Sequence, residues 1–397
     1  MRDMNRRKLE RLGEIAREMT DKGFVSGVSC MVIQHGEEQY YHESGYRDIS
    51  TGRKMTRDTI HRLYSMTKPI TAAAVMILLE EGRIDLLDHV SDYLPSFRNQ
   101  YVVDCGVAVP VTRPMTIQNL LNMTSGLVYL GESNPAEVRS ERLVEEIKQK
   151  LLTDKALTTL EIADRIGQIP LAFMPGESWQ YGLSADVLGA VVEVVSGMRF
   201  GEFLSKKIFD PLGMTDTGFY VAPDKQERLA KVYRETEDGL IEERECHLGI
   251  QNKMELPPAF ESGGAGLCST IDDYAKFTQM LLGHGTYQGV SILSPQTVEY
   301  MTTAHITSDQ QRGMKTWESL AGHSYGNLMR IMTVPEEAAY IGSKGEYGWD
   351  GWLGTYMTND PVNDMTLLIM LQRCDSGITG YTRRMRNVVF SALESRK

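Results

Sequence analysis

A serine and a lysine three residues apart, Ser65 and Lys68, are the residues whose types and spacing best suit nucleophilic chemistry. A serine hydroxyl is a weak nucleophile until a base takes its proton, and a lysine amine in a dry pocket is neutral enough to do so. Residues three apart share one side of a helix, so this spacing can bring the amine to the hydroxyl. The alternative is structural, with Ser65 as a helix cap and Lys68 pointing into water. Short motifs also occur by chance, so the surrounding sequence has to decide.

The sequence after Lys68 predicts a buried helix. An apolar run from Ile70 to Leu79 is closed by Gly82, which is typical of a helix that is apolar on nearly every side. Pro69 fits only in the first helical turn, where its missing N–H would have no partner in any case. Ser65 is thereby placed at the helix N-terminus, whose free N–H groups and positive partial charge favour an oxyanion.

Two further segments contain residues that could complete a site. Tyr181 comes just before a helix predicted over 183–195, and a phenol beside a lysine can share protons with it. Gly351 allows close approach to the backbone, and the next amide, that of Trp352, could donate to an oxyanion. In isolation each segment also has a structural interpretation: a half-buried tyrosine that is hydrogen-bonded locally, and a turn with a packed indole. The eight histidines form no evident metal-ligand pair, and no G-x-S-x-G motif occurs, so we expect no metal site.

Composition excludes several classes of function. The length of 397 residues predicts two subdomains, and the formal net charge of −11 argues against a nucleic-acid partner. No polybasic segment is present that would bind anionic lipid. Five widely spaced cysteines without a C-x-x-C pair predict neither a disulfide framework nor a zinc site. Since the N-terminal segment has no apolar signal-peptide core and no apolar run is long enough to cross a membrane, we expect a cytoplasmic protein.

The order of elements predicts an α/β fold of the α+β type. Strands are expected near both ends of the chain and helices in the middle. The segments that carry this expectation are a helix at 9–19, a hairpin of 28–34 and 38–42, strands at 325–333, 353–358 and 366–371, and a helix at 382–393. They predict an antiparallel sheet flanked by N- and C-terminal helices, with an inserted all-helical subdomain. We expect residues 1–62 and 265–397 to form the sheet domain, residues 63–264 the mainly helical subdomain, and the active site to lie at their interface. Residues 223–258 lack periodicity and are not assigned.

Several motifs in order resemble the serine β-lactamase and penicillin-binding-protein superfamily, in its class C branch, and within that branch most resemble the family VIII carboxylesterases. The motifs are Ser65-Met-Thr-Lys68, the block 115–127, Pro211-Leu-Gly-Met214 and Gly263-Gly-Ala-Gly-Leu267. The resemblance covers nearly the whole chain and implies a β-lactamase-like fold and no cofactor. It implies that Ser65 is the acyl-accepting nucleophile, Lys68 its proton acceptor and Tyr181 the partner acid/base. It also implies an oxyanion hole formed by the backbone N–H groups of Ser65 and Trp352.

Two departures from the class C pattern bear on the substrate. Leu183 stands where those enzymes have asparagine, and Trp349-Asp350-Gly351 stands where they have Lys-Thr-Gly; the esterases similarly have tryptophan there. Loss of the lysine removes the obvious partner for a substrate carboxylate, and we expect Asp350 to repel that group further. The sequence therefore predicts a serine hydrolase that forms an acyl-enzyme on Ser65 and acts on small ester or amide substrates, with weak or no β-lactamase activity.

Other functions on the same scaffold remain open at this level. The chain could be a class C-type β-lactamase, or a D-amino-acid peptidase or transpeptidase acting on cell-wall-like peptides. An acyltransferase would differ only in the acceptor that enters after acylation, and a binding or sensor domain would be an inactive form. The physiological substrate, the acyl-chain length and the oligomeric state are not predicted.

Overall fold

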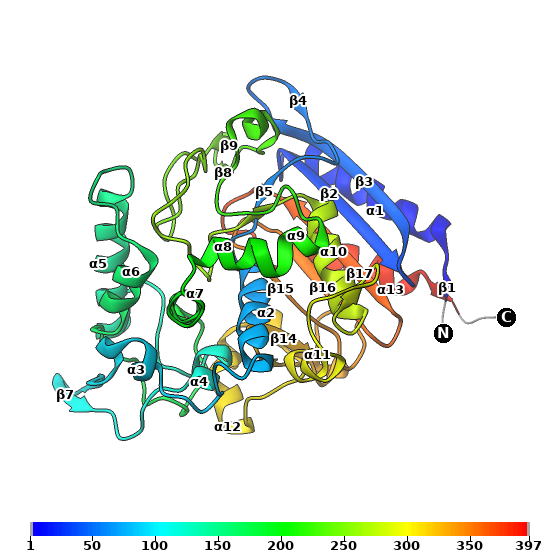
Figure 1. Cartoon of the computed structure of the whole chain (residues 1–397). Helices are drawn as coiled ribbons and strands as arrows, with labels where there is room; N and C mark the ends of the chain where they lie inside the picture. The colour runs from blue at the N-terminus through cyan, green and yellow to red at the C-terminus, as the bar shows by residue number, and fades with distance from the viewer. Residues whose placement is uncertain (1–2, 395–397) are drawn as a thin grey trace.

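The computed structural model, which describes residues 3–394, contains an antiparallel sheet of eight strands (Figure 1). In spatial order the strands are β13 (His323–Gly326), β14 (Met329–Met332), β15 (Tyr347–Asp350), β16 (Tyr356–Asp360), β17 (Met365–Leu371), β2 (Gly27–Gln34), β3 (Glu37–Asp48) and β4 (Arg53–Lys54). Neighbouring strands β17 and β2 come from opposite ends of the chain, with Leu367 opposite Val32. The prediction of one antiparallel sheet built from both terminal regions is therefore confirmed.

Each face of the sheet carries helices, because successive side chains of a strand point to opposite faces. On one face lie α1 (Arg6–Asp21) and α13 (Gly380–Ser391), and on the other lie α2 (Thr67–Glu80) and α10 (Ile271–Leu282). Cys30 and Val32 of β2 share a core with α1 and α13, whereas Met31 and Ile33 belong to the core on the other side. The terminal helices predicted from the sequence are thus confirmed as the layer that covers one face.

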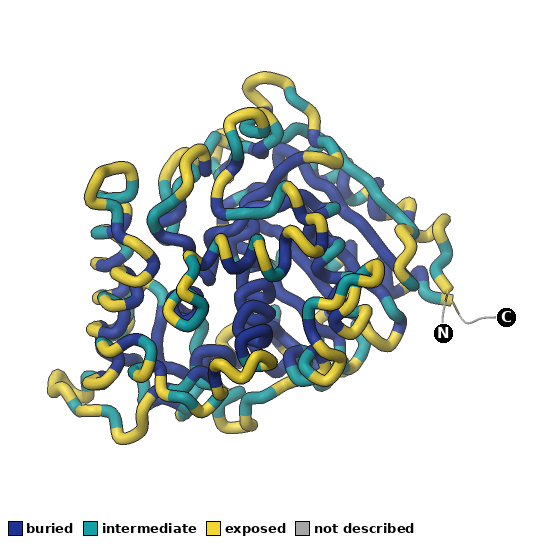
Figure 2. Tube along the Cα trace, viewed as in Figure 1, coloured by how far each residue is buried: buried dark blue, intermediate teal, exposed yellow. Residues whose placement is uncertain are grey.

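The helix α2 is the buried centre of the molecule. Every residue from Thr67 to Leu78 is buried, and Figure 2 shows this helix dark blue along most of its length. Pro69 lies in its first turn, as predicted. Ser65 precedes the helix in the 3-10 turn η1 (Tyr64–Met66), directly after Tyr64, whose φ is +46°. The serine therefore sits at the entry to a helix that the core holds on all sides.

Helices dominate the segment between α2 and α10. They are α3 (Val90–Tyr93), α4 (Ile117–Leu121), α5 (Pro135–Lys150), α6 (Thr159–Ile166), α7 (Ser184–Ser196), α8 (Phe200–Leu204) and α9 (Asp210–Leu212), and α11 (Pro295–Met301) and α12 (Ser308–Gln311) follow α10. In Figure 1, α5 and α6 lie at the left of the view, the sheet at the right, and α2 between them. Within residues 3–394, no helix combines the length and the apolar character needed to cross a bilayer.

The inserted segment is not all-helical, which corrects the sequence prediction. The short strand pairs of the fold are β1 (Asp3–Met4) with β18 (Leu393–Glu394), β5 (His61–Arg62) with β10 (Cys268–Ser269), β6 (Tyr101–Asp104) with β7 (Val107–Pro110), β8 (Tyr233–Thr236) with β9 (Gly239–Glu242), and β11 (Thr286–Tyr287) with β12 (Val290–Ser291). Two of these hairpins lie within residues 63–264. Valines favour the β6–β7 pair, which turns at Cys105 and Gly106, both with positive φ. The division into 1–62 with 265–397 and 63–264 stays a prediction.

Near the C-terminus two predicted strands have different bounds. The strand expected over 325–333 is the hairpin β13–β14, which turns at Asn327 and Leu328 with φ values of +48° and +64°. Asparagine is common in this conformation but leucine is not; the Leu328 amide donates to the Leu121 carbonyl at 2.8 Å, a contact distant in sequence. The strand expected over 353–358 is β16, which spans Tyr356–Asp360. Trp349 and Asp350, for which a turn was the structural alternative, lie on β15.

Candidate active site

Ser65 and Lys68 meet at the entry to α2. Lys68 Nζ lies 3.2 Å from Ser65 Oγ, and the lysine is 0 % exposed. Its amine also donates to the Gly264 carbonyl at 2.8 Å. Burial lowers the pKa of Lys68 to about 7, against the opposing effect of the carboxylates of Asp186 and Asp350. The alternative in which Lys68 points into water is therefore wrong, and near neutral pH a large fraction of the amine is free to accept a proton.

Tyr181 reaches the same point from the loop before α7. Its hydroxyl accepts a hydrogen bond from Trp349 Nε1 at 2.9 Å and is hydrogen-bonded to Ser65. The centroid of its ring lies 4.5 Å from Lys68 Nζ. Burial raises the pKa of this phenol, and the bonds to Ser65 and Trp349 lower it in part. The structure thus brings together the three residues predicted as catalytic, with Tyr181 as a protonated phenol.

A second tyrosine, Tyr129, completes the surroundings of the amine. Its hydroxyl lies 3.0 Å from Lys68 Nζ, and its ring packs edge-on against Tyr181 with centroids 5.5 Å apart. Burial raises the pKa of Tyr129 well above its ordinary value. Sequence reasoning missed this residue, although it follows the predicted turn at Ser125 and Gly126, where Gly126 has a φ of +84°. That turn is what directs the chain back from α4 toward the site.

Asp186 was also missed and fixes the carbonyl that holds the lysine. Its Oδ1 accepts from Ser262 Oγ at 2.5 Å and from the Gly264 amide at 3.1 Å. Because the Gly264 carbonyl accepts from Lys68, the carboxylate positions the amine through this loop. Burial raises the pKa of Asp186, while the Ser262 bond and the Lys68 charge lower it. A charged residue within the buried first half of α7 was the available sequence signal, since buried charges require partners.

Gly351 matters because two stretches of chain approach each other there. A Cβ at Gly351 would lie 2.3 Å from the Leu63 carbonyl oxygen and 2.2 Å from Thr355 Oγ1, and the Thr355 hydroxyl donates to that same carbonyl at 3.0 Å. The glycine therefore lets the end of β15 contact the chain two residues before Ser65. A direct role of Gly351 toward a substrate stays a prediction.

The next residue, Trp352, is held by its side chain. Its indole stacks on His247 at 3.9 Å between ring centroids and donates to Asp375 Oδ1 at 2.7 Å. In the part of the chain that the structure describes, the Trp352 amide makes no hydrogen bond to another protein group. A free amide next to Gly351 is compatible with an oxyanion hole formed with the Ser65 amide, which stays a prediction.

The charge of Asp350 is balanced by a buried arginine. Arg330 Nη1 lies 3.2 Å from Asp350 Oδ1, with side chains 1 % and 19 % exposed respectively, and Arg330 also donates to the Met357 carbonyl. This corrects the expectation that Asp350 adds repulsion for an anionic substrate, because the arginine offsets its charge. The same burial keeps Arg330 from meeting a substrate carboxylate.

The remaining two predicted pocket residues differ in access. Trp349 is buried among aromatic rings, with Tyr181 and Tyr325 centroids 5.3 Å and 5.2 Å away, so it acts on the site through Tyr181. Leu183, also buried, lies at the start of α7 and lines an apolar cavity. Leu183, which stands where class C enzymes have asparagine, therefore forms part of the apolar wall of this cavity.

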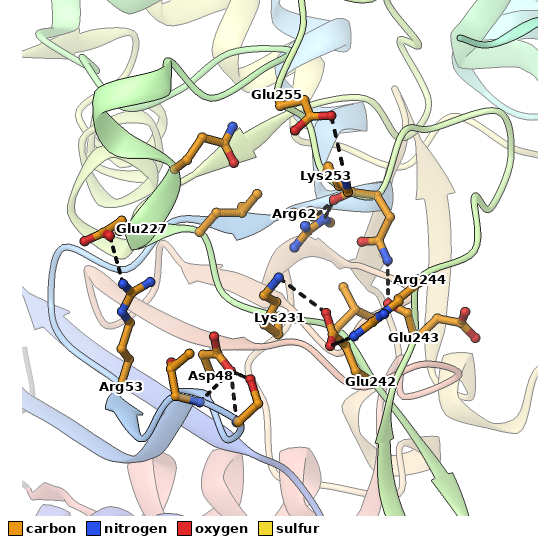
Figure 3. A pocket seen from close by; sticks show the side chains of 16 residues that line it. Asp48, Arg53, Arg62, Glu227, Lys231, Glu242, Glu243, Arg244, Lys253 and Glu255 are labelled. Atoms are coloured by element: carbon orange, nitrogen blue, oxygen red, sulfur yellow. Dashed lines mark hydrogen bonds and ion pairs between the residues drawn. The ribbon is translucent and has the colours of Figure 1, made fainter.

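A charged hollow of about 560 Å³ lies beside β5, and Figure 3 shows its side chains. Its ions pair largely with each other, as in Arg53 with Glu227 and Lys231 with Glu242. Its residues include neither Ser65 nor Lys68, and we assign it no role in the chemistry.

A serine that contacts a buried lysine and a tyrosine, at the entry to a buried helix beside an antiparallel sheet, defines the class of serine hydrolases that use lysine as the base. The model of the Beta-lactamase family matches residues 12–385, and the chain belongs to this family. The predicted superfamily, the β-lactamase-like fold and the expectation of a serine hydrolase enzyme are thereby confirmed.

Relatives across the whole chain include esterases. Protein Rv1367c of Mycobacterium tuberculosis is 36% identical over 371 residues, covering 90% of this chain and 88% of its own. Esterase EstB of Burkholderia gladioli is 29% identical, covering 92% and 91%. The structure of EstCE1, a hydrolase with promiscuous acyltransferase activity, superposes with a TM-score of 0.81 at 28% identity, covering 97% and 99%.

Proposed function

We propose that this protein is a serine esterase that hydrolyses small uncharged esters through an acyl-enzyme on Ser65, with weak or no β-lactamase activity. The observation that carries the proposal is the buried Lys68 amine, with a pKa of about 7, 3.2 Å from Ser65 Oγ. An amine in this state accepts the serine proton at neutral pH without a histidine.

The reaction follows from the contacts of these residues. Lys68 takes the proton of Ser65 as Oγ attacks the ester carbonyl, and the amides of Ser65 and Trp352 stabilise the oxyanion. The leaving alkoxide takes a proton from the Tyr181 phenol, which the Lys68 ammonium then restores. Water replaces the alcohol and repeats the sequence, releasing the acid and free Ser65.

Charge and lining support a neutral ester over a β-lactam or a peptide carboxylate. The cation beside Asp350, Arg330, is buried and paired with that carboxylate, so it offers no partner to a substrate carboxylate. Leu183 presents an apolar wall where class C enzymes have an amide. The names of EstB and EstCE1 are consistent with ester chemistry. The cytoplasmic location stays a prediction from the N-terminal sequence.

The decisive experiment is labelling with a serine-directed fluorophosphonate, followed by peptide mapping. We expect the adduct on Ser65, and we expect Ser65→Ala to lose p-nitrophenyl acetate turnover by at least about 10³-fold. The exposed Ser133→Ala variant is the matched control and should retain wild-type rates. Labelling elsewhere, or full turnover by Ser65→Ala, would refute the proposal, and faster nitrocefin than ester hydrolysis would refute its substrate class.

Acyl transfer to an alcohol is the second candidate, favoured by the acyltransferase activity named for EstCE1. It shares the same acyl-enzyme and differs only in the acceptor. Adding increasing butanol to the ester assay and measuring butyl ester against free acid distinguishes the two outcomes.

A further inference from the structure

Three aromatic rings pack together beside the two predicted oxyanion donors. The imidazole of His247 stacks on the indole of Trp352, with ring centroids 3.9 Å apart and ring planes 20° apart. The ring of Tyr64 meets that indole edge-on at 5.0 Å and lies 5.8 Å from the imidazole. Tyr64, His247 and Trp352 together form the aromatic clamp. Because Tyr64 directly precedes Ser65, the clamp joins the chain at Ser65 to the chain at Trp352.

The direction of each donor amide depends on the clamp. Tyr64 is buried and has a φ of +46°, which is costly for a tyrosine and requires surrounding contacts to hold it. The peptide group that follows this residue carries the Ser65 N–H. On the other side, the Trp352 carbonyl accepts from the Ser376 amide at 3.0 Å, and its indole donates to Asp375 Oδ1 at 2.7 Å. The packing of the rings therefore bears on how both N–H groups point.

The loop that carries His247 is tied across its base. Asn252 Nδ2 donates to the Glu243 carbonyl at 2.6 Å. The Asn252 carbonyl in turn accepts from Arg62 Nε at 2.6 Å, and Arg62 is buried three positions before Ser65. The loop is thereby anchored to the same stretch of chain that leads to the serine, which keeps His247 in place against the indole.

The imidazole of His247 is a neutral ring at neutral pH. Burial lowers the pKa of His247 to about 4, against the opposing effect of the Asp375 carboxylate. That carboxylate is itself paired, since Arg234 Nη1 lies 2.8 Å from Asp375 Oδ2. A neutral, flat ring stacked on an indole stabilises it by packing rather than by charge. The side chain therefore supplies a flat surface that holds the indole of Trp352.

We propose that His247 is a positioning residue of the oxyanion hole, which fixes the Trp352 amide by stacking on the indole of the same residue. The inference rests on the proposed acyl-enzyme chemistry of Ser65, and it gives a role to the segment 223–258. A donor acts on the oxyanion most strongly when it is held in place before charge develops. Loss of the stack should therefore lower kcat and change KM little.

The test replaces His247 by alanine and by phenylalanine. His247→Ala removes the stacked ring, and kcat for p-nitrophenyl acetate should fall about tenfold at nearly constant KM. His247→Phe keeps a flat ring without the imidazole nitrogens, and its kcat should stay within about twofold of wild type. His305→Ala is the matched control and should keep wild-type rates, since His305 is also partly buried but packs on Tyr300, with centroids 4.2 Å apart. A loss in His247→Phe as large as that in His247→Ala would overturn the positioning role.

A second measurement reports on the oxyanion hole itself. A thionoester places sulfur where the hole receives oxygen, and sulfur is a weak hydrogen-bond acceptor. The ratio of the ester rate to the thionoester rate should therefore be lower in His247→Ala than in wild type, and unchanged in His247→Phe. An unchanged ratio in folded His247→Ala would mean that the lower kcat has another cause, and it would overturn the inference.

A third variant covers the case in which His247→Ala does not fold. Asp375→Ala removes an exposed carboxylate that accepts the indole N–H, and it should lower both kcat, by about fivefold, and the rate ratio. A folded variant of either kind that keeps the wild-type kcat and ratio overturns the positioning role and leaves the esterase standing. Absence of both turnover and Ser65 labelling in wild type overturns the esterase, and the role of His247 with it.

Discussion

Trp349 donates its indole N–H to the hydroxyl oxygen of Tyr181 at 2.9 Å. An indole nitrogen can only donate, so the phenol accepts this bond and keeps its own proton for another partner. The Ser65 side chain also interacts with this hydroxyl. A residue that the sequence presented as the replacement for a lysine therefore serves as the support of the tyrosine.

Replacing Trp349 with phenylalanine should lower kcat about fivefold and change KM little. The variant keeps a large ring but removes the donor, a hydrogen bond worth about 1 kcal/mol, and leaves the pKa of Tyr181 higher still. Steady-state kinetics with p-nitrophenyl acetate measures the effect. Trp317→Phe is the control, since Trp317 packs on Tyr181 without bonding its hydroxyl. Equal losses in both variants would contradict the role of the indole N–H.

The pH profile should show an acidic limb set by Lys68. The amine acts as a base only when neutral, and its pKa is about 7, so kcat/KM should fall about tenfold per pH unit well below pH 7. Asp186→Asn removes a negative charge that raises the pKa of Lys68. The acidic limb of the kcat/KM profile of this variant should therefore lie at lower pH than that of the wild type. The exposed Asp154→Asn serves as the control. If the acidic limb of Asp186→Asn stays in place or moves to higher pH, the Asp186 charge does not raise the pKa of Lys68.

Tyr181 and Tyr129 should contribute differently to kcat. Tyr181→Phe removes the proton donor to the leaving group, and we expect kcat to drop about 10²–10⁴-fold. Tyr129→Phe removes one hydrogen bond to the lysine, and we expect a drop of about tenfold with a shifted acidic limb. Single-turnover acylation rates separate the two effects from product release. A larger loss in Tyr129→Phe than in Tyr181→Phe would reverse the assignment.

A buried ion pair behind the sheet should dominate local stability. Arg386 of α13 meets Glu346 at 2.5 Å and 2.8 Å through two bonds, and both side chains are buried. Removing Arg386 leaves the buried Glu346 charge without its partner. Arg386→Met should therefore lower the free energy of unfolding by about 3–5 kcal/mol in urea titrations. The exposed pair of Lys22 and Glu18 is the comparison, and Lys22→Met should cost under about 1 kcal/mol.

The same pair predicts a pH effect on stability. Burial alone would raise the pKa of Glu346, but the charge and hydrogen bonds of Arg386 and the Thr358 hydrogen bond together outweigh burial, so the folded-state pKa lies below the ordinary value. Its contribution is therefore present above the unfolded glutamate pKa and is lost as pH falls through the lower folded value. Urea midpoints of wild type and Glu346→Gln should converge in acid, and a constant difference would contradict this.

The sequence was most informative where chemistry depends on local spacing. Ser65 and Lys68 share one turn of chain, and the apolar run behind them predicted their burial. The contact of Tyr129 with Lys68 was not predicted, because it depends on the turn at Gly126 and on the packing of α4 against α7. Hydrophobic periodicity in the sequence does not indicate such packing. The pairing of Arg330 with Asp350 was not predicted for a related reason: the two residues meet only when β14 pairs with β15, across the connection of residues 333–346.

The pairing of β2 with β17 also has a consequence for biosynthesis. The ribosome makes residues 27–34 early, but their sheet neighbour, residues 365–371, emerges near the end of translation. Until then β2 has an open edge, and open edges invite pairing with other chains. Trp349 is late as well, so a chain stalled before β15 carries Ser65 and Lys68 without the support of Tyr181. Interrupted translation should therefore yield inactive, aggregation-prone products.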